Sequence, residues 1–188
     1  MPLIILDRDG VINADSDDYI KTLDEWQALP GSIEAIAALC KAGFTVVVAT
    51  NQSGLSRGLF DLDDLEAMHE QLRELVEAAG GEIAGIFYCP HHPDDNCDCR
   101  KPKPGLFDAI ARELELDLSS ERTIAVGDSF RDLEAAVESG CRPVLVRTGK
   151  GSKTESELVE HRNPIVRKTT VYDDLRAAAT EIINGNLR

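Results

Sequence analysis

The chain alternates short apolar runs with longer segments in which apolar residues recur with a helical period. Runs that carry almost no charge are typical of strands buried on both faces of a sheet. The sequence therefore predicts strands at residues 3–6, 45–49, 83–88, 123–126 and 143–146. Because helical segments separate them, the predicted fold is α/β, a doubly wound parallel sheet formed by residues 1–188 as one domain.

The helical segments are marked by their period and also by residues that favour helix starts and ends. The clearest segment begins at Asp61, keeps apolar residues on one face and ends at Gly80 and Gly81. The polar segment 149–164 predicts an irregular connection, followed by a short last strand near residues 165–166. No segment is large enough for a second, cap-like domain. Similar patterns predict further helices at residues 32–43, 105–114, 130–139 and 172–183.

The charge balance narrows the possible partners. The 188 residues include 20 Lys and Arg against 34 Asp and Glu, a formal net charge of −14. Such a surface repels duplex nucleic acid and anionic membranes. No apolar stretch approaches the roughly 20 residues of a membrane helix, and residues 1–6 lack the cationic start of a signal peptide. We expect a cytoplasmic monomer whose partner is a small molecule.

Acidic residues stand directly after two of the predicted strands. Asp7 and Asp9 follow the first strand, and Asp128 follows the fourth, with Asp132 one helical turn later. Residues i and i+2 of an extended segment point the same way, so Asp7 and Asp9 present two carboxylates to one small volume. Because like charges this close need a cation or a proton between them, the oxygens predict a Mg²⁺ site. A solvated turn is the alternative interpretation of an isolated Asp-x-Asp-Gly.

Hydroxyl-bearing and basic residues occupy two other strand-end loops. Residues 50–54 offer a threonine hydroxyl and successive backbone N–H groups to an anion. Arg100, Lys101 and Lys103 stand within four positions, directly before a predicted helix. In a chain of net negative charge, cations concentrated in one such loop indicate a phosphate site. A solvent-facing basic run is the alternative.

Taken in order, these motifs resemble those of the haloacid-dehalogenase-like phosphatases. The resemblance implies that Asp7 attacks a phosphomonoester to form an aspartyl phosphate, with Asp9 as general acid and base. It implies a Mg²⁺ ion held by Asp7, the Asp9 carbonyl oxygen and Asp128. Thr50 and Lys101 are implied to stabilise the phosphoryl oxygens. The matching residues are Asp7-x-Asp9-Gly10, Thr50, Lys101-Pro102 and Gly127-Asp128-x-x-x-Asp132.

A loop rich in cysteine and histidine follows the third predicted strand. Three thiolates and one imidazole complete a tetrahedral zinc set with no open position, which indicates a structural ion. Reduced thiols in a surface loop are the alternative. Fixing this loop would hold Arg100 and Lys101 behind it in place. The predicted ligands are Cys89, His91, Cys97 and Cys99, with His91 preferred over His92 because Cys89-x-His91 parallels Cys97-x-Cys99.

The zinc loop narrows the resemblance to two groups, the heptose bisphosphate phosphatases of lipopolysaccharide precursor synthesis and the histidinol-phosphate phosphatases. Residues 50–60 and 103–105 resemble the heptose group more closely. That resemblance implies removal of the 7-phosphate of D-glycero-D-manno-heptose 1,7-bisphosphate, with Arg100 on the second phosphate. The substrate-binding candidates are Asp15, Tyr19, Asn51, Gln52, Ser53, Arg57 and Arg100.

A receiver-type phospho-switch is the alternative from a non-enzymatic class. Such domains also combine a parallel α/β fold with Asp, Thr, Lys and Mg²⁺. Their accepting Asp lies on a middle strand, whereas the second predicted strand here ends at Thr50. The zinc loop is foreign to that class too, so the sequence favours the phosphatase.

Overall fold

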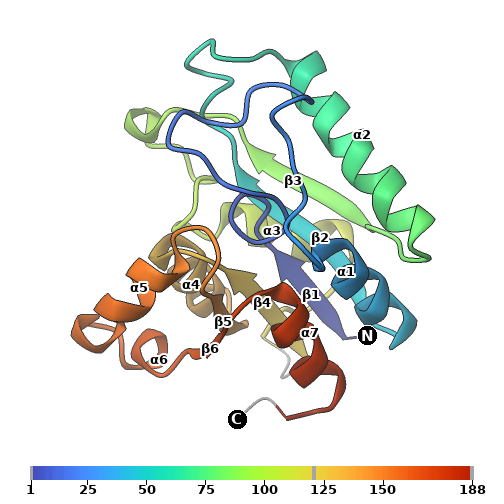
Figure 1. Cartoon of the computed structure of the whole chain (residues 1–188). Coiled ribbons are helices and arrows are strands. Elements are labelled where there is room, and N and C mark those ends of the chain that lie inside the picture. The colour runs from blue at the N-terminus through green and yellow to red at the C-terminus, as the bar shows by residue number, and fades with distance from the viewer. Residues whose placement is uncertain (1, 120–121, 187–188) are drawn as a thin grey trace.

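The computed structural model describes residues 2–119 and 122–186, and a six-stranded parallel sheet runs through its centre (Figure 1). The strand order is β3-β2-β1-β4-β5-β6, so β1 and β4 lie in the interior of the sheet. The predicted doubly wound α/β fold is confirmed. The strands are β1 (Leu3–Leu6), β2 (Thr45–Asn51), β3 (Gly85–Cys89), β4 (Thr123–Gly127), β5 (Arg142–Val146) and β6 (Thr170–Tyr172).

Helices form the connections between the strands. The second helix begins after Asp61, as the sequence predicts. Asp61 and Asp64 cap its start reciprocally, because each side chain accepts a hydrogen bond from the other residue's backbone N–H. The helices are α1 (Ser32–Lys41), α2 (Leu62–Ala78), α3 (Gly105–Glu113), α4 (Phe130–Glu138), α5 (Gly151–Glu157), α6 (Pro164–Arg167) and α7 (Leu175–Ile183), with short 3₁₀ turns η1 (Pro93–Asp95) and η2 (Leu158–Glu160).

The two faces of the sheet pack against different helices because side chains alternate along each strand. In β1, Ile4 and Leu6 pack in one core cluster with residues of α1, α2 and α7. Leu3 and Ile5 pack in another cluster with residues of α3 and α4. All four side chains are buried. β1 therefore has no polar face, and the first polar residue of this segment comes directly after its last strand residue.

The C-terminal third differs from the prediction. The segment 149–164, predicted to be irregular, contains α5 and η2. The last strand is β6, not residues 165–166, because Asn163 accepts a hydrogen bond from the Ile165 N–H at 2.9 Å and starts α6 there. The predicted helix 172–183 begins only after Asp174, whose side chain caps α7 by accepting from Ala177.

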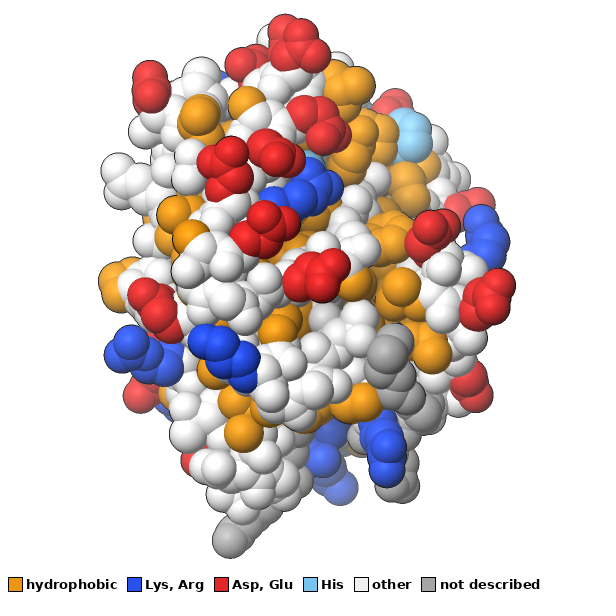
Figure 2. All heavy atoms as spheres, turned by 90° about the vertical axis from the view of Figure 1, so that its right-hand side faces the viewer, with side chains coloured by type: hydrophobic (Ala, Val, Ile, Leu, Met, Phe, Trp, Pro, Cys, Tyr) orange, Lys and Arg blue, Asp and Glu red, His pale blue; other side chains and the backbone are white. Residues whose placement is uncertain are grey.

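The surface reflects the acidic composition. Figure 2 shows Asp and Glu side chains spread across one face of the molecule. In the described part of the chain, no helix has the length and apolar character needed to cross a membrane.

Candidate active site

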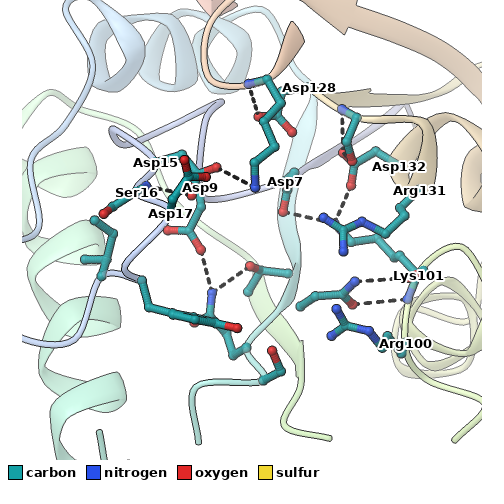
Figure 3. Close-up of a pocket in the computed structure, with 18 residues that line it drawn as sticks. Asp7, Asp9, Asp15, Ser16, Asp17, Arg100, Lys101, Asp128, Arg131 and Asp132 are labelled. Atoms are coloured by element: carbon teal, nitrogen blue, oxygen red, sulfur yellow. Dashed lines mark hydrogen bonds and ion pairs between the residues drawn. The ribbon is translucent and has the colours of Figure 1, made fainter. Parts of the chain in front are cut away.

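The candidate active site is a pocket at the carboxyl ends of the interior strands (Figure 3). Asp7 follows β1, Thr50 lies near the end of β2, and Asp128 follows β4. Leu6, the last residue of β1, pairs with Val48 of β2 and Val126 of β4. The residues that follow these pairs therefore lie at the same edge of the sheet. Ligands of open α/β sheets bind beyond such strand ends.

Asp7 is held through one of its two carboxylate oxygens. Its Oδ1 accepts hydrogen bonds from Lys101 Nζ at 2.9 Å and from the Arg8 N–H at 2.8 Å. No described residue donates a hydrogen bond to Oδ2, which leaves that oxygen to a ligand. Burial and the nearby Asp132 raise the pKa of Asp7 to about 7 against the opposing effect of Lys101. A cation in the pocket would favour the ionised, nucleophilic form.

Lys101 is a buried cation surrounded by oxygen atoms. Its Nζ donates to Asp7 at 2.9 Å, to the Ala49 carbonyl at 2.7 Å and to Asp132 at 2.6 Å. These bonds engage all three ammonium protons. Burial lowers the pKa of Lys101, but the two carboxylates outweigh it and hold the pKa above its ordinary value. The Asn51 amide fixes the Lys101 backbone by donating to its carbonyl and accepting from its N–H, each at 3.1 Å.

Asp128 lies directly against backbone. The Lys150 N–H donates to its Oδ2 at 2.8 Å. A Cβ added at Gly10 or Gly149 would lie only 2.1 or 2.2 Å from that oxygen, so both positions require glycine. Burial, together with the nearby charges of Asp7 and Asp132, raises the pKa of Asp128 to about 8.

Three carboxylates, two of them buried and that of Asp7 half-buried, could hold a cation here. Oxygens of Asp7, Asp128 and Asp132 lie within 4.8 Å of one another. Asp132 already accepts from Lys101 through Oδ1 and from the Ser129 backbone and hydroxyl through Oδ2, at 3.0 and 2.7 Å. Burial opposes its ionisation, but these donors hold the pKa of Asp132 below its usual range. Asp7 and Asp128 are thus the side chains that a cation would stabilise, and their oxygen donors fit Mg²⁺.

Asp9 points its carboxylate at a different set of donors. Oδ1 accepts from Arg8 Nε at 3.1 Å, from Arg8 Nη2 at 2.9 Å and from Asn13 at 2.9 Å. Oδ2 accepts from Gln52 at 2.8 Å. Burial would raise the pKa of Asp9, but these donors hold it below its usual range. These donors hold the Asp9 carboxylate, which lines the pocket, from several sides. A metal contact from the backbone carbonyl oxygen of Asp9 stays a prediction.

Thr50 and Asp9 are linked by one side chain. The Gln52 amide nitrogen donates both to Asp9 and to Thr50 Oγ1, the latter at 2.9 Å. Because the Thr50 hydroxyl accepts this bond, its own proton is available to a ligand oxygen. Gln52, predicted as a substrate contact, thus connects two site residues while it lines the pocket.

The other predicted substrate residues divide into two groups. Asp15, Tyr19, Ser53 and Arg100 line the pocket, as do Asn51 and Gln52. Arg57 does not line it: its side chain is exposed and lies over the Tyr19 ring, 5.8 Å from the centroid. Arg100 reaches the pocket with a buried Nη1 that no described residue satisfies.

Sequence reasoning missed two cations of the pocket, Arg131 and Lys150. Arg131 lies in the first turn of α4, and its place three residues after Asp128 could have indicated it. Lys150 lies in the segment predicted to be irregular, where its Nζ forms an ion pair with Asp15 at 3.1 Å. No described carboxylate pairs with Arg131 or Arg100, and burial and the charge of Arg131 lower the pKa of Arg100.

The structure brings together the four predicted ligands of the cysteine-rich loop. The Sγ atoms of Cys89 and Cys99 are 3.0 Å apart, and Cys97 Sγ lies 3.6 Å from each. His91 Nδ1 lies 3.2 Å from Cys99 Sγ, whereas His92 Nδ1 accepts from the Asp94 N–H instead. All four candidate ligand atoms lie within 4.8 Å of one another. Three thiols and one imidazole at this spacing fit a tetrahedral zinc ion.

Residues 98–178 match the family model described as HAD-hydrolase-like. The site agrees with this class of hydrolases: an acidic residue follows an interior strand, a lysine lies beside it, and a second acid follows the neighbouring strand.

Full-length relatives narrow this class. The chain is 58% identical over 181 residues to the D-glycero-beta-D-manno-heptose-1,7-bisphosphate 7-phosphatase of Pseudomonas aeruginosa, covering 96% of this chain and 97% of the relative. The chain is also 39% identical to the Escherichia coli phosphatase of the same name, over 84% of this chain and 85% of the relative. The D,D-heptose 1,7-bisphosphate phosphatase of B. bronchiseptica, solved with magnesium and phosphate, is similar with 52% identity and a TM-score of 0.91, covering 98% and 99%. The chain belongs to this family of heptose bisphosphate phosphatases.

The acidic cluster generates a prediction about stability. Because the pKa of Asp128 is raised from 3.8 to about 8, the folded metal-free protein binds more protons than the unfolded chain between these values and loses stability as the pH rises through them. Asp128→Asn keeps an acceptor for Lys150 without the charge. We expect the variant and the parent to unfold alike near pH 4, and the variant to be more stable above pH 8 by roughly a few kcal/mol. Denaturant titrations in a chelator test this, with the exposed Asp24→Asn as control; a pH-independent difference would contradict it.

Proposed function

We propose that the protein is a magnesium-dependent phosphomonoester hydrolase that removes the 7-phosphate of D-glycero-D-manno-heptose 1,7-bisphosphate in lipopolysaccharide precursor synthesis. The observation that carries this proposal is Asp7, with Oδ1 fixed by Lys101 and Oδ2 open to the pocket. The relatives are phosphatases of the beta bisphosphate by name, and we propose the same anomer for this chain.

The first half of the reaction is phosphoryl transfer to Asp7. Oδ2 of Asp7 attacks phosphorus and the bond to the oxygen on carbon 7 breaks, which leaves an aspartyl phosphate. The departing oxygen takes a proton from Asp9 and becomes a hydroxyl. Asp9 is ionised in the free protein, so it must take up that proton as the substrate dianion enters.

The second half returns the enzyme to its first state. Asp9, now a carboxylate, takes a proton from water as the water oxygen attacks phosphorus. The phosphorus–Oδ2 bond breaks, which releases inorganic phosphate and the Asp7 carboxylate. Asp9 then gives its proton to solvent, which restores the ionised carboxylate of the free protein. The same Asp9 carboxylate therefore has to face the leaving oxygen and then the water, which is why the contacts that orient it matter.

Two further groups face the transferred phosphoryl group. The free proton of the Thr50 hydroxyl can donate to a phosphoryl oxygen. Lys101 fixes the nucleophile, and it can reach a phosphoryl oxygen by exchanging one of its three present hydrogen bonds. Both roles stabilise negative charge that develops during transfer.

The raised pKa values of Asp7 and Asp128 support a magnesium site between them. When bound, Mg²⁺ supplies positive charge that offsets the repulsion between the nucleophilic carboxylate and the phosphate. Gly10 and Gly149 leave room for Asp128 to take this position.

A bisphosphate needs a second anion site, and we assign it to Arg100 and Arg131. Arg100 has an unsatisfied buried Nη1, and Figure 3 shows both arginines on the same side of the pocket. Two unpaired guanidiniums that repel each other are stabilised by a dianion between them. The phosphate on carbon 1 would thus bind here while the other phosphate meets Asp7.

We propose that Cys89, His91, Cys97 and Cys99 hold a structural zinc ion. The four ligands leave no open coordination position, and Arg100 follows Cys99 directly in the chain. The ion would therefore fix the backbone that carries Arg100 and Lys101. We also propose that the enzyme works in the cytoplasm as a monomer.

The function predicts a ranking of substrates. We expect kcat/KM for the heptose 1,7-bisphosphate to exceed those for histidinol phosphate and fructose 1,6-bisphosphate by at least about 100-fold, because the relatives are heptose bisphosphate phosphatases by name and Arg100 and Arg131 offer a second anion site. Phosphate release in the presence of Mg²⁺ measures this. Asp7→Asn should abolish turnover without unfolding the protein. A preference for histidinol phosphate, or residual turnover by Asp7→Asn, would contradict the proposal.

The second phosphate site predicts substrate-dependent losses. Arg100→Ala and Arg131→Ala should each lower kcat/KM for the bisphosphate by roughly 10- to 100-fold, the loss of a charged hydrogen bond. Their effect on heptose 7-phosphate should be much smaller. The exposed Arg112→Ala on α3 is the matched control. Equal losses on the two substrates would exclude a role at the second phosphate.

The cysteine-rich loop predicts bound metal. Elemental analysis should find about one zinc ion per chain, lost in Cys97→Ser but kept in Cys40→Ser, which lies outside the cluster. Removal of zinc by chelation, followed by addition of Mg²⁺, should lower activity by loosening Lys101. A protein without zinc that stays fully active after chelation would rule out this role.

A further inference from the structure

The residue between the two acids of the first motif is a buried cation. Arg8 is 0% exposed and is the largest fully buried side chain of the described chain. Its Nε and Nη2 hold the Asp9 carboxylate, Nη2 contacting both oxygens at 2.9 and 3.1 Å. A buried guanidinium is tolerated only where its donors find partners. One end of the group is thus satisfied by Asp9, and the other needs an acceptor from elsewhere.

That acceptor comes from the long helix α2. His69 Nε2 lies 3.3 Å from Arg8 Nη1, and the imidazole is 1% exposed. Burial, with the charges of Arg8 and Arg73, lowers the pKa of His69 to about 3. The ring is therefore neutral at ordinary pH, and Nε2 accepts from the guanidinium if Nδ1 carries the proton. The Tyr88 ring, 5.9 Å away between centroids, packs beside it.

We propose that His69 is a positioning residue for Asp9: by accepting from Arg8 Nη1 it fixes the guanidinium, whose other nitrogens set the orientation of the Asp9 carboxylate. This inference rests on the proposed function, in which Asp9 transfers the protons. Two contacts, from His69 to Arg8 and from Arg8 to Asp9, connect helix α2 in the core to a side chain at the pocket. Asn13 and Gln52 hold Asp9 from its other sides but do not reach the guanidinium.

The connection has a specific chemical consequence. An alkoxide leaves phosphorus poorly unless it is protonated, whereas p-nitrophenolate is stable and leaves without a proton. A shift of Asp9 by a fraction of an ångström should therefore slow phosphoryl transfer from the sugar phosphate and spare transfer from p-nitrophenyl phosphate. The later attack of water on the aspartyl phosphate is common to both substrates, so the transfer step alone carries the difference. General loosening of the site would slow both.

The test compares His69→Leu with His69→Gln on these two substrates. In single turnovers that follow phosphoryl transfer to Asp7, we expect His69→Leu to lower the transfer rate for the heptose bisphosphate by roughly 10- to 100-fold and to leave that for p-nitrophenyl phosphate within about threefold, with KM for the heptose bisphosphate within about twofold. His69→Gln keeps an acceptor that can reach Arg8 and should restore most of the rate. Met68→Leu, a neighbouring buried residue of α2, is the control for packing alone.

Each outcome decides the proposal. Equal losses in the transfer rate on both substrates, no loss in a folded His69→Leu variant, or a similar loss in Met68→Leu would overturn it. If His69→Leu does not fold, His69→Asn, which has an amide too short to reach Arg8, should show the same leaving-group dependence, and equal losses would again overturn the role. Turnover by the parent protein reports on the proposed function separately, because the inference depends only on the ratio between variants and substrates.

Discussion

The site depends on one ammonium group held among carboxylates. Lys101 donates to Asp7 and Asp132 from a position that is almost completely buried. Without it, adjacent acids in a low-dielectric pocket would have to take up protons, and the nucleophile would be lost. Lys101 in turn depends on Asn51 at the end of β2 and on the loop that follows the cysteine cluster. The charge balance of the pocket is therefore built from several strand ends and not from one motif.

The acids of the pocket have different environments although they share one volume. Asp9 and Asp132 have enough donors to stay ionised when buried, whereas the pKa values of Asp7 and Asp128 are raised by burial and by neighbouring charges. The two incompletely compensated groups, Asp7 and Asp128, are those that we propose to hold the cation. Unequal compensation thus separates them from the acids that depend on protein donors alone.

The arginines in and near the pocket also differ in whether a protein group partners them. In a chain of net charge −14, acidic partners are abundant, yet Arg100 and Arg131 reach the pocket without a carboxylate partner among the described residues. Arg57, by contrast, lies over an aromatic ring outside the pocket. An unpaired guanidinium is costly when partly buried, so the unsatisfied Nη1 of Arg100 is best explained by an anionic ligand.

The sequence alone determined the elements whose signals are local. Buried parallel strands carry continuous apolar runs, so the acid that ends each run was evident at Asp7 and Asp128, and the spacing of cysteines and His91 indicated one cluster. Only the tertiary structure decided which distant groups meet: Lys101 with Asp132, Gln52 with Asp9, and Arg131 and Lys150 at the pocket. The helices in the polar segment 149–164 also escaped prediction, because they are short and carry weak periodicity. Local patterns specify elements, whereas strand order and packing bring together side chains that are far apart along the chain.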